Sequence, residues 1–316
     1  DHHQPEISLP EAYAIVNPNR IDDTSNLNYL AAVGVTYFFL IGLNRKLRTV
    51  KWFSNNDVVE PNMISFLDIT ALGTICDAVP LKGINRLFVI KGIEVMNKQL
   101  NVGLKSLIDK SAIKGRISTY DLGFKLGPRI NAAGRLGRSS FGTELLTATD
   151  ATNAEKIASE LDKFNQERRT IESYVLDSAE KQVTPEKLEK KLLTVYEEGW
   201  HEGVIGIIAS RLKDKYHRPC VVITISKGNA KGSGRSMKGI DLGNLVIAAK
   251  QAGIIESGGG HSMAAGLSLK EEKIEELENF FENQLSRNQS KVIDEKMFYV
   301  DSLISSSGIN LDVYDD

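Results

Sequence analysis

The sequence has few of the residues that would tie it to an extracellular or membrane setting. Its 316 residues include only two cysteines, Cys76 and Cys220, each among apolar neighbours, so we expect reduced core thiols rather than a disulfide or a metal pair. The longest strongly apolar run surrounds residues 37–41 and is far shorter than the ~20 residues that span a bilayer. No signal-peptide pattern opens the sequence. These absences predict a cytoplasmic protein without membrane contact.

An overall positive charge is also missing. Lys and Arg number 39 against 41 Asp and Glu, a net charge of −2, whereas a sequence-independent nucleic-acid binder usually carries a basic surface. The charge is unevenly distributed, however, because residues 105–138 hold eight basic residues against two acidic ones, while acidic residues gather at 271–282 and at the end of the chain. This asymmetry is typical of a phosphate-facing groove on an acidic body, and also of a solvated helical face.

Hydrophobic periodicity predicts helices through most of the first half of the chain. Ala12–Val16, before an Asn-Pro turn, predicts a short buried strand. Apolar residues spaced three to four apart then predict helices at 27–47, 62–76 and 85–100. Residues 153–183 contain no glycine or proline and predict one long connecting helix. We therefore expect a domain at 1–150 and a connecting helix at 151–186.

After Pro185, strand-like and helix-like segments alternate, which predicts a second compact domain at 187–290. The predicted strands lie at 192–196, 220–225, 232–236 and 261–269, and the predicted helices at 205–215, 242–252 and 271–285. A last strand-like stretch at 297–304 has no return strand or closing helix after it. Residues 291–316 are therefore predicted to begin a further, OB-like domain.

Two sites in the first half have the residue types of a metal centre. Asp1-His2-His3 combines a carboxylate with two imidazoles, a donor set that suits Mn²⁺, Fe or Zn. Taken alone, this tripeptide is equally typical of a tag or cloning remnant. Asp77 ends an apolar helix, where an unpaired charge would be costly to bury, so it is a second candidate ligand. Its alternative role is that of a capping or ion-paired aspartate.

The segment Gly127–Arg135 is a candidate phosphate-binding element. Its glycines permit backbone geometries closed to other residues and let a phosphate approach closely. Arg129 and Arg135 offer planar forks that match phosphate oxygens, and Asn131 adds a neutral donor. The alternative is a turn with ordinary surface arginines.

Two further segments in the second half suggest anion binding. Gly258-Gly259-Gly260-His261 predicts successive backbone N–H groups around an anion, with His261 as an added donor, or else a flexible hairpin loop.

The other segment combines a serine–arginine strand with a tryptophan–histidine pair. Ser233 and Arg235, with Trp200 and His201, are candidates for a phosphate or base contact surface. Trp200 is either a stacking face or a core residue.

Six motifs in a fixed order resemble the DHH phosphoesterase superfamily, and within it the bacterial single-strand-specific 5′→3′ DNA exonucleases. They are Asp-His-His, Gly-Thr-Ile-Cys-Asp-Ala-Val-Pro, Gly-Pro-Arg-Ile-Asn-Ala-Ala-Gly-Arg-Leu, Glu-Gly-Trp-His-Glu-Gly-Val-Ile-Gly-Ile, Gly-Ser-Gly-Arg-Ser and Gly-Gly-Gly-His. The resemblance covers nearly the whole chain. It implies an α/β fold in which a truncated DHH domain, a parallel sheet with helices, is joined by a long helix to a smaller α/β DHHA1 domain.

The resemblance also implies roles for individual residues. It makes His2 and Asp77 metal ligands and places His3 against the scissile phosphate. The DNA backbone would be held by Arg129, Asn131 and Arg135, a 5′ phosphate by Ser233 and Arg235, and a further phosphate by Gly259, Gly260 and His261, with Trp200 and His201 beside them.

The implied cofactor is a two-metal site of Mn²⁺ or Mg²⁺. The superfamily's upstream Asp-x-Asp-Gly motif does not occur in this sequence, so we expect an incomplete site and an inactive chain. The implied partner is single-stranded DNA with a 5′ phosphate; single-strand-binding protein and a helicase are candidate partners, and a monomer is expected. Two alternatives stay open, a nano-RNA or cyclic-dinucleotide phosphodiesterase of the same superfamily and a non-catalytic single-strand-binding module.

Overall fold

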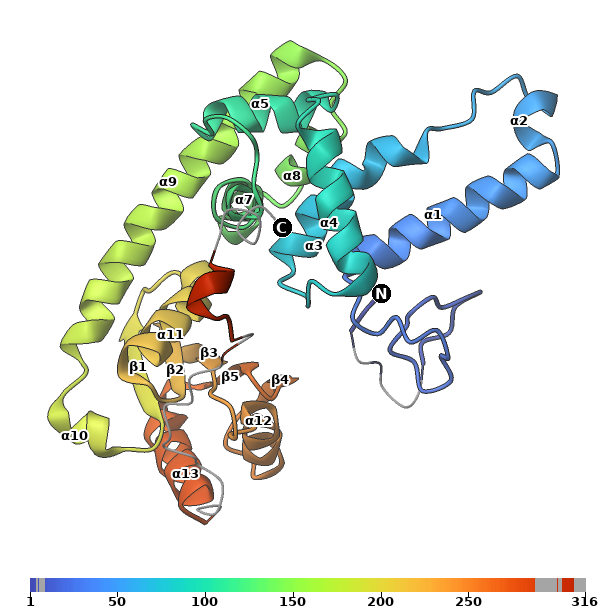
Figure 1. Cartoon of the computed structure of the whole chain (residues 1–316). Helices are drawn as coiled ribbons and strands as arrows, with labels where there is room; N and C mark the ends of the chain where they lie inside the picture. Colours follow the sequence, from blue (N-terminus) through green and yellow to red (C-terminus); the bar gives the residue numbers. More distant parts are fainter. Residues whose placement is uncertain (4, 6–8, 288–299, 301–302, 310–316) are drawn as a thin grey trace. The chain divides into compact units, whose positions relative to one another are not determined.

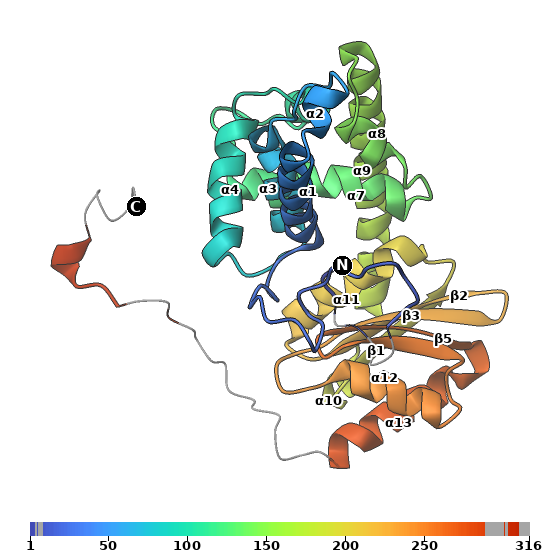
Figure 2. The same cartoon turned by 90° about the vertical axis from the view of Figure 1, so that its right-hand side faces the viewer.

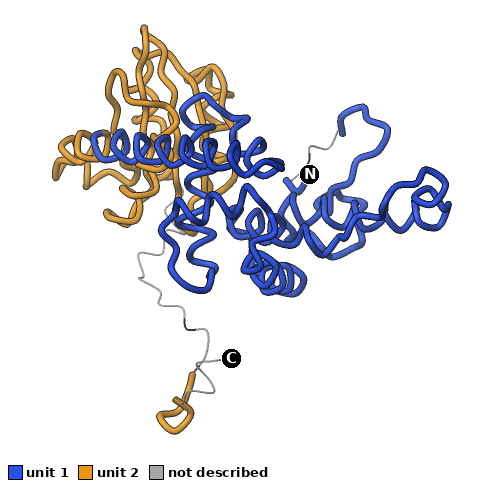
Figure 3. The backbone as a smooth tube through the Cα atoms, turned by 90° about the horizontal axis from the view of Figure 1, so that it is seen from above, with its two compact units in different colours: residues 1–174 blue, residues 175–316 orange. Residues whose placement is uncertain are grey.

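The computed structural model describes residues 1–3, 5, 9–287, 300 and 303–309. The chain forms two compact units, Asp1–Tyr174 and Val175–Asp316, which Figure 3 shows in different colours. In the described part of the chain, no helix is long and apolar enough to cross a membrane.

The regular secondary structure in the described residues of unit 1 is helical, and it begins at Ala32 after a non-helical N-terminal segment (Figure 1). The three predicted helices are present with shifted ends, and the predicted connecting helix is one continuous helix of 31 residues, α9. The helices of this half are α1 (Ala32–Thr49), α2 (Trp52–Asn55), η1 (Met63–Phe66), α3 (Leu67–Cys76), α4 (Gly83–Met96), α5 (Val102–Lys110), α6 (Thr119–Asp121), the π-helix η2 (Leu122–Leu126), α7 (Gly127–Arg135), α8 (Phe141–Leu146) and α9 (Ala151–Lys181).

The prediction of a strand at Ala12–Val16 is wrong. These residues belong to no strand, and the described residues of unit 1 contain none. Carbonyl groups here find other partners: Arg20 Nη1 donates to Ile15 O at 2.7 Å, and the backbone nitrogen of Asp1 donates to Val16 O at 3.0 Å. The parallel sheet expected for residues 1–150 is therefore not present in the part of them that is described.

The core of unit 1 fixes the segment that carries the Gly127–Arg135 motif. Leu122 and Leu126 are fully buried against α3, α5 and α9 residues such as Leu72 and Leu107. Because α6, η2 and α7 follow one another without a break from Thr119 to Arg135, these two leucines anchor the whole helical run. The motif therefore stands on a rigid element.

Unit 2 is a five-stranded sheet with helices on both faces (Figure 2). The strand order is β1-β2-β3-β5-β4; β1 and β2 are parallel and the other neighbours antiparallel. The mixed α/β class predicted for the chain is confirmed. The elements are α10 (Pro185–Glu189), β1 (Leu193–Glu198), α11 (Glu202–Tyr216), β2 (Cys220–Ser226), β3 (Asn229–Arg235), α12 (Leu242–Gln251), β4 (Ser257–His261), β5 (Ala264–Lys270), η3 (Glu271–Lys273) and α13 (Ile274–Arg287).

The two faces of this sheet are covered differently. Alternate residues of β2, β3 and β5, among them Ile223, Ala230 and Leu267, form a buried core with α12 and α13. The opposite face carries α11, which packs on β2 and β3. Figure 2 shows α11 on one side and α12 with α13 on the other. Ser233 and Arg235 alternate with Gly232 and Gly234 along β3 and therefore point to the α11 side.

Two smaller predictions have different outcomes. Cys220 is buried as expected, but Cys76 is an exposed residue at the end of α3, so the expectation of two core cysteines is half wrong. The strand predicted at 297–304 lies mostly outside the described residues, of which 303–309 contain only the short helix η4 (Ser306–Gly308). The further domain stays a prediction.

Candidate functional site

The Asp1-His2-His3 tripeptide and Asp77 come together in unit 1. His2 Nε2 lies 3.3 Å from Asp77 Oδ2, and His3 Nδ1 lies 2.9 Å from Asp1 Oδ1. The two imidazole rings are 4.4 Å apart between centroids. The same Asp1 oxygen also accepts from the backbone N–H groups of His2 and His3, so it is engaged within the tripeptide. The pair that points across the fold is His2 with Asp77.

Two asparagines that the sequence analysis did not single out hold this tripeptide. Asn19 Nδ2 donates to His2 O at 2.7 Å, and Asn17 Nδ2 donates to His3 O at 2.9 Å. Asn17 is buried, and its Oδ1 accepts from the Asn19 N–H. The signal in the sequence was the Asn-Pro-Asn turn, whose short polar side chains bond to nearby backbone. This turn therefore holds the backbone of the two histidines in place.

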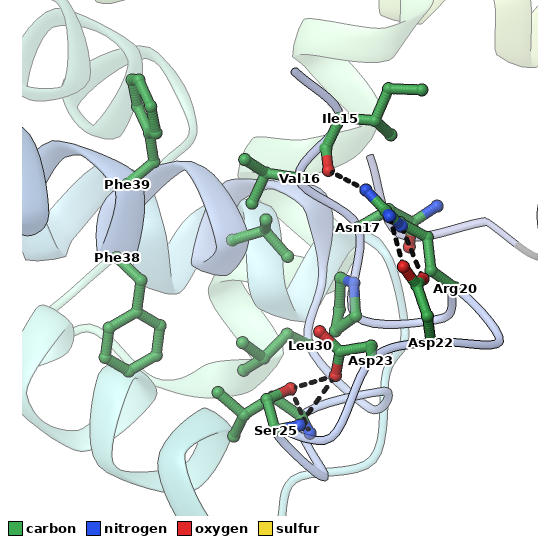
Figure 4. Close-up of a pocket in the computed structure, with 13 residues that line it drawn as sticks. Ile15, Val16, Asn17, Arg20, Asp22, Asp23, Ser25, Leu30, Phe38 and Phe39 are labelled. Atoms are coloured by element: carbon green, nitrogen blue, oxygen red, sulfur yellow. Dashed lines mark hydrogen bonds and ion pairs between the residues drawn. The ribbon is translucent and has the colours of Figure 1, made fainter. Parts of the chain in front are cut away.

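A cavity of about 490 Å³ lies beside the same turn (Figure 4). Its acidic groups already have partners: Arg20 Nε donates to Asp22 at 2.8 Å, and Ser25 Oγ donates to Asp23 at 2.5 Å. Hydrogen bonding to Arg20 holds the pKa of Asp22 below its usual value. On one side of the cavity the carboxylates of Asp22 and Asp23 are therefore engaged in structural hydrogen bonds. The other side is apolar and formed by Leu27, Leu30, Val35, Phe38 and Phe39.

Asp77 is the residue that ends α3. Its N–H donates to Gly73 O at 3.0 Å, while its side chain remains partly exposed toward His2. The preceding Cys76 turns its sulfur toward Leu122 O, 3.8 Å away. Burial of this sulfur, with the Asp77 carboxylate as the second cause, raises the pKa of the Cys76 thiol to about 11. Without a cation beside it, the Cys76 thiol is therefore neutral near pH 7.

The Gly127–Arg135 motif is helix α7 and not a glycine loop, which corrects the expectation of an unusual backbone. The reason is close packing: a Cβ on Gly127 would lie 2.4 Å from Cys76 Sγ and 3.1 Å from Leu122 O. The missing side chain lets α7 approach the end of α3. The motif thereby starts next to the residue that precedes Asp77.

The polar residues of α7 differ in how far they are exposed. Arg129 Nε donates to Asp162 Oδ1 at 2.8 Å and its Nη1 to Lys125 O at 2.8 Å, with only 12% of the side chain exposed. This arginine fixes α7 to α9. Asn131 and Arg135 are exposed residues. Contact of all three with a DNA backbone stays a prediction, and the geometry gives Arg129 a positioning role first.

In unit 2, Ser233 and Arg235 are neighbours on β3. Arg235 Nη1 donates to Ser233 Oγ at 3.2 Å and to Gly234 O at 2.8 Å. A Cβ on Gly206 of α11 would lie 2.9 Å from Ser233 Oγ and 3.0 Å from Arg235 Nη2. Gly206 therefore makes the space in which these two side chains lie. Its signal in the sequence was a glycine inside a predicted helix, where glycine costs about 1 kcal/mol relative to alanine.

Gly258–His261 belongs to the edge strand β4 and does not form the predicted set of N–H groups around one anion. Contact of Gly259, Gly260 and His261 with a phosphate stays a prediction. Successive N–H groups of a strand point in opposite directions and do not meet at one anion. Pairing places Gly259 opposite Gly266, and Gly266 opposite Ser233. Directly paired residues share one face of a sheet. Gly266 and Gly259 therefore continue the row of Ser233 across β5 and β4, and neither adds a side chain to that face. His261, paired with Ala264, stands in the next row with Arg235.

Of the two roles left open for Trp200, the structure favours the core residue over the stacking face. Trp200 is 4% exposed, and its carbonyl accepts from Thr224 Oγ1 at 2.5 Å, so it is a core residue of unit 2. His201 is the N-cap of α11, where its Nδ1 accepts from the Gly203 N–H at 3.0 Å. A contact between His201 and phosphate stays a prediction, since this ring nitrogen is already engaged.

The described residues contain no group of three or more His, Cys, Asp or Glu side chains arranged to hold a metal ion. His2 Nε2 and Asp77 Oδ2 are nevertheless the nitrogen and oxygen donors that Mn²⁺ accepts, and Mg²⁺ prefers oxygen donors such as the Asp77 carboxylate. Neither atom belongs to a buried core pair, because Asp77 is 39% exposed in its side chain. The pair fits a part of a metal site.

Parts of this chain are similar to known proteins. Residues 189–287 match the DHHA1 domain family. The single-stranded-DNA-specific exonuclease RecJ of Dickeya dadantii is 39% identical over 292 residues, 89% of this chain and 50% of that protein. A crystal structure of exonuclease RecJ bound to manganese matches 91% of this chain and 68% of its own with a TM-score of 0.72 at 29% identity. RecJ of Thermus thermophilus with Mg²⁺ matches 74% of this chain and 36% of its own, with a TM-score of 0.66 at 30% identity. The chain spans about half the length of the curated relatives it matches.

Proposed function

We propose that this chain forms part of a single-strand-specific DNA exonuclease. The proposal starts from its DHHA1 domain and from its similarity to RecJ over most of its length. The reaction is metal-dependent hydrolysis of phosphodiester bonds in the 5′→3′ direction, in DNA repair and recombination. The observation that carries this proposal is the approach of His2 to Asp77. An imidazole and a carboxylate from distant segments, backed by an asparagine turn, are what a divalent-metal nuclease needs.

In this proposal His2 and Asp77 hold the metal. A bound Mn²⁺ or Mg²⁺ supplies a water of lowered pKa and polarises the phosphate. Asn17 and Asn19 fix the backbone of the histidines, which sets the direction of His2 Nε2 toward Asp77. His3 is close enough to the His2 ring to donate to the scissile phosphate beside it. The other ligands of a two-metal site come from outside the described residues, so we expect the chain alone to turn over slowly or not at all.

The DNA backbone is bound by the exposed residues of α7. Asn131 and Arg135 offer one amide and one guanidinium donor, and charge-assisted contacts of this kind suit phosphate oxygens. Arg129, held by Asp162, keeps α7 in place and adds positive charge. In unit 2, Ser233, Arg235 and the side-chain-free row formed with Gly266 and Gly259 receive the 5′ phosphate. A phosphate can approach backbone closely where no Cβ intervenes.

The wider setting is part of the same proposal. Single-stranded DNA with a 5′ phosphate is the proposed substrate, in the cytoplasm, and the protein acts as a monomer. Single-strand-binding protein and a helicase are the proposed partners. These statements rest on the likeness to RecJ.

The test uses fluorescence anisotropy with 5′-labelled and 3′-labelled oligonucleotides, single-stranded and duplex, with and without Mn²⁺. We expect tighter binding to the single strand than to the duplex, and any nucleotides released in Mn²⁺ to come first from the 5′ end. Equal affinity for duplex, or release that starts at the 3′ end, would contradict the proposal.

A further inference from the structure

Two exposed aromatic rings lie stacked on unit 1, just before α7. The ring centroids of Tyr120 and Phe124 are 4.9 Å apart with an interplanar angle of 26°, and the residues are 60% and 63% exposed. Single exposed apolar residues are ordinary, whereas a contiguous apolar surface marks an interaction site. Keeping both rings in water forgoes about 25 cal/mol for each Å² of apolar surface left unburied. The pair therefore has the character of a binding surface.

The pair stands on a rigid and unusual piece of helix. Phe124 lies in the π-helix η2, which ends just before Gly127 and Pro128. Pro128 has no N–H and cannot make the usual bond to the carbonyl four residues earlier, which accounts for a wide turn here. π-Helical turns occur often at functional sites.

Buried side chains, a helix cap and close packing fix the backbone of this segment. Leu122 and Leu126 are fully buried between and beyond the rings. The helix begins in a capping box in which Ser118 Oγ accepts from the Asp121 N–H and Asp121 Oδ2 accepts from the Ser118 N–H. A Cβ on Gly123 would touch Ile75 at 3.4 Å, two residues from Asp77. Because the backbone that carries the rings is fixed before any ligand arrives, only the two side chains have to be ordered on binding.

The charges around the pair largely compensate one another. Lys125 Nζ lies 5.9 Å from the Tyr120 ring centroid and 2.7 Å from Asp121 Oδ1. Arg129, whose Nη1 donates to the Lys125 carbonyl, is paired with Asp162. Net charge therefore gives this spot little affinity for a bare phosphate. The ring faces are the attractive feature, and a flat aromatic group is the ligand that extends a stack of two parallel rings.

We propose that Tyr120 and Phe124 form a stacking platform for a nucleobase of single-stranded nucleic acid. The inference rests on the proposed function, because the strand that supplies the base is the one whose backbone Asn131 and Arg135 bind on the same helical run. Stacking on aromatic side chains is tolerant of sequence, since every base has a flat face. The platform thus adds affinity for unpaired bases, which a duplex cannot offer.

The experiment scans a 2-aminopurine base through a single-stranded oligonucleotide and measures its fluorescence and affinity with four proteins. The native chain and Tyr120→Phe, which keeps the ring, should quench one or two positions. Phe124→Leu keeps apolar bulk without a ring and should lose that quenching, with binding weaker by roughly 5- to 100-fold. Tyr174→Leu removes an exposed tyrosine elsewhere in the same unit, 66% exposed on α9, and should behave as native.

The decisive experiment is a double-mutant cycle that combines Phe124→Leu with an abasic site at the quenched position of the oligonucleotide. The abasic site should weaken binding to the native chain by the factor seen for Phe124→Leu, and should weaken binding to Phe124→Leu no further. Additive losses, or quenching at no position while the strand still binds, overturn the platform and leave the proposed function standing. Absence of any single-strand binding overturns both. A concentration-dependent dimer that Phe124→Leu abolishes would show that the rings bind a second copy of the chain instead.

Thermal unfolding of each variant guards against a folding defect. Both rings are exposed, so we expect all four proteins to unfold at similar temperatures. Should Phe124→Leu unfold early, Phe124→Tyr, which retains a ring, must restore quenching and affinity. Failure of that restoration in a folded protein also overturns the platform.

Discussion

Two motifs of the molecule contain several glycines, α7 in unit 1 and β4 in unit 2, and these glycines have different structural roles. In α7 the glycine at position 127 brings a helix against Cys76, and side chains such as Asn131 and Arg135 carry the polar groups. In β4 three successive glycines, between Ser257 and His261, leave the middle of an edge strand without side chains. The structural role of a glycine therefore depends on which atoms a Cβ at its position would touch, and a glycine-rich motif does not by itself predict a loop.

The largest expected effect is at Gly260 in β4. An added Cβ would lie 2.3 Å from Ala264 O and 2.5 Å from Ala265 Cα, and backbone atoms cannot move aside cheaply. We expect Gly260→Ala to destabilise unit 2 by about 3 kcal/mol. Urea unfolding followed by fluorescence of the buried Trp200, in a Trp52→Phe background, measures it. Gly259→Ala, with nothing within 4 Å, is the control, and equal losses in the two variants would contradict the edge-strand packing.

A somewhat smaller effect is expected at Gly127 in α7, where the nearest atom is a side-chain sulfur. Gly127→Ala should destabilise unit 1 by about 2 kcal/mol, measured by circular dichroism during urea unfolding. The double change with Cys76→Ala should recover most of the loss, because it removes the colliding sulfur. Gly134→Ala in the same helix meets only Ser139 Cα at 4.0 Å and should stabilise by up to ~1 kcal/mol. A loss of stability in Gly134→Ala as large as that in Gly127→Ala would contradict the claim that close packing at Gly127 is what requires glycine there.

The third effect concerns binding more than stability. Gly206→Ala would press on Ser233 Oγ and Arg235 Nη2, both of which are ends of side chains that can shift. We expect stability to change by less than about 1 kcal/mol, while the preference for a 5′-phosphorylated over a 5′-hydroxyl strand falls about 10-fold. The affinity for the 5′-hydroxyl strand is the internal control. An unchanged preference would mean that Ser233 and Arg235 do not receive the 5′ phosphate.

The smallest effect is expected at Gly259, whose substitution fills the open row beside Ser233 without touching protein atoms. Gly259→Ala should leave unfolding within about 0.5 kcal/mol of native. The affinity for a 5′-phosphorylated single strand should fall about 3-fold, because a methyl group keeps phosphate from the backbone. Competition binding with phosphorylated and unphosphorylated oligonucleotides measures this, and equal affinity for both by the native chain would already contradict it.

Periodicity predicted the amphipathic helices and the apolar strands well, since their side chains alternate with the backbone. It failed where side chains carry no such signal. β4 was not predicted because three glycines have no hydrophobic pattern. The helix α7 was not predicted because Gly127 and Pro128 open it, although proline is tolerated in the first turn of a helix. Ala12–Val16 has the apolar composition of a strand, but its carbonyls bond to Arg20 and to the backbone of Asp1 instead.

For the candidate site, the sequence supplied residue types and the fold supplied their neighbours. His2 and Asp77 are distant in sequence, and only the resemblance linked them before the structure placed them 3.3 Å apart. The supporting roles of Asn17, Asn19 and Gly206 were not predicted, because a supporting contact depends on tertiary packing. For Trp200 the sequence left a stacking face and a core position open, and the burial of the side chain decides for the core.

The most direct test of the central claim is Mn²⁺ binding by the chain, followed by electron paramagnetic resonance of free Mn²⁺. Asp177, an exposed aspartate on α9, provides the matched control as Asp177→Asn. We predict that the native chain and Asp177→Asn bind Mn²⁺ with equal affinity, and that Asp77→Asn weakens binding at least 10-fold because a charged oxygen ligand is lost. Equal binding by all three proteins would contradict a metal held between His2 and Asp77.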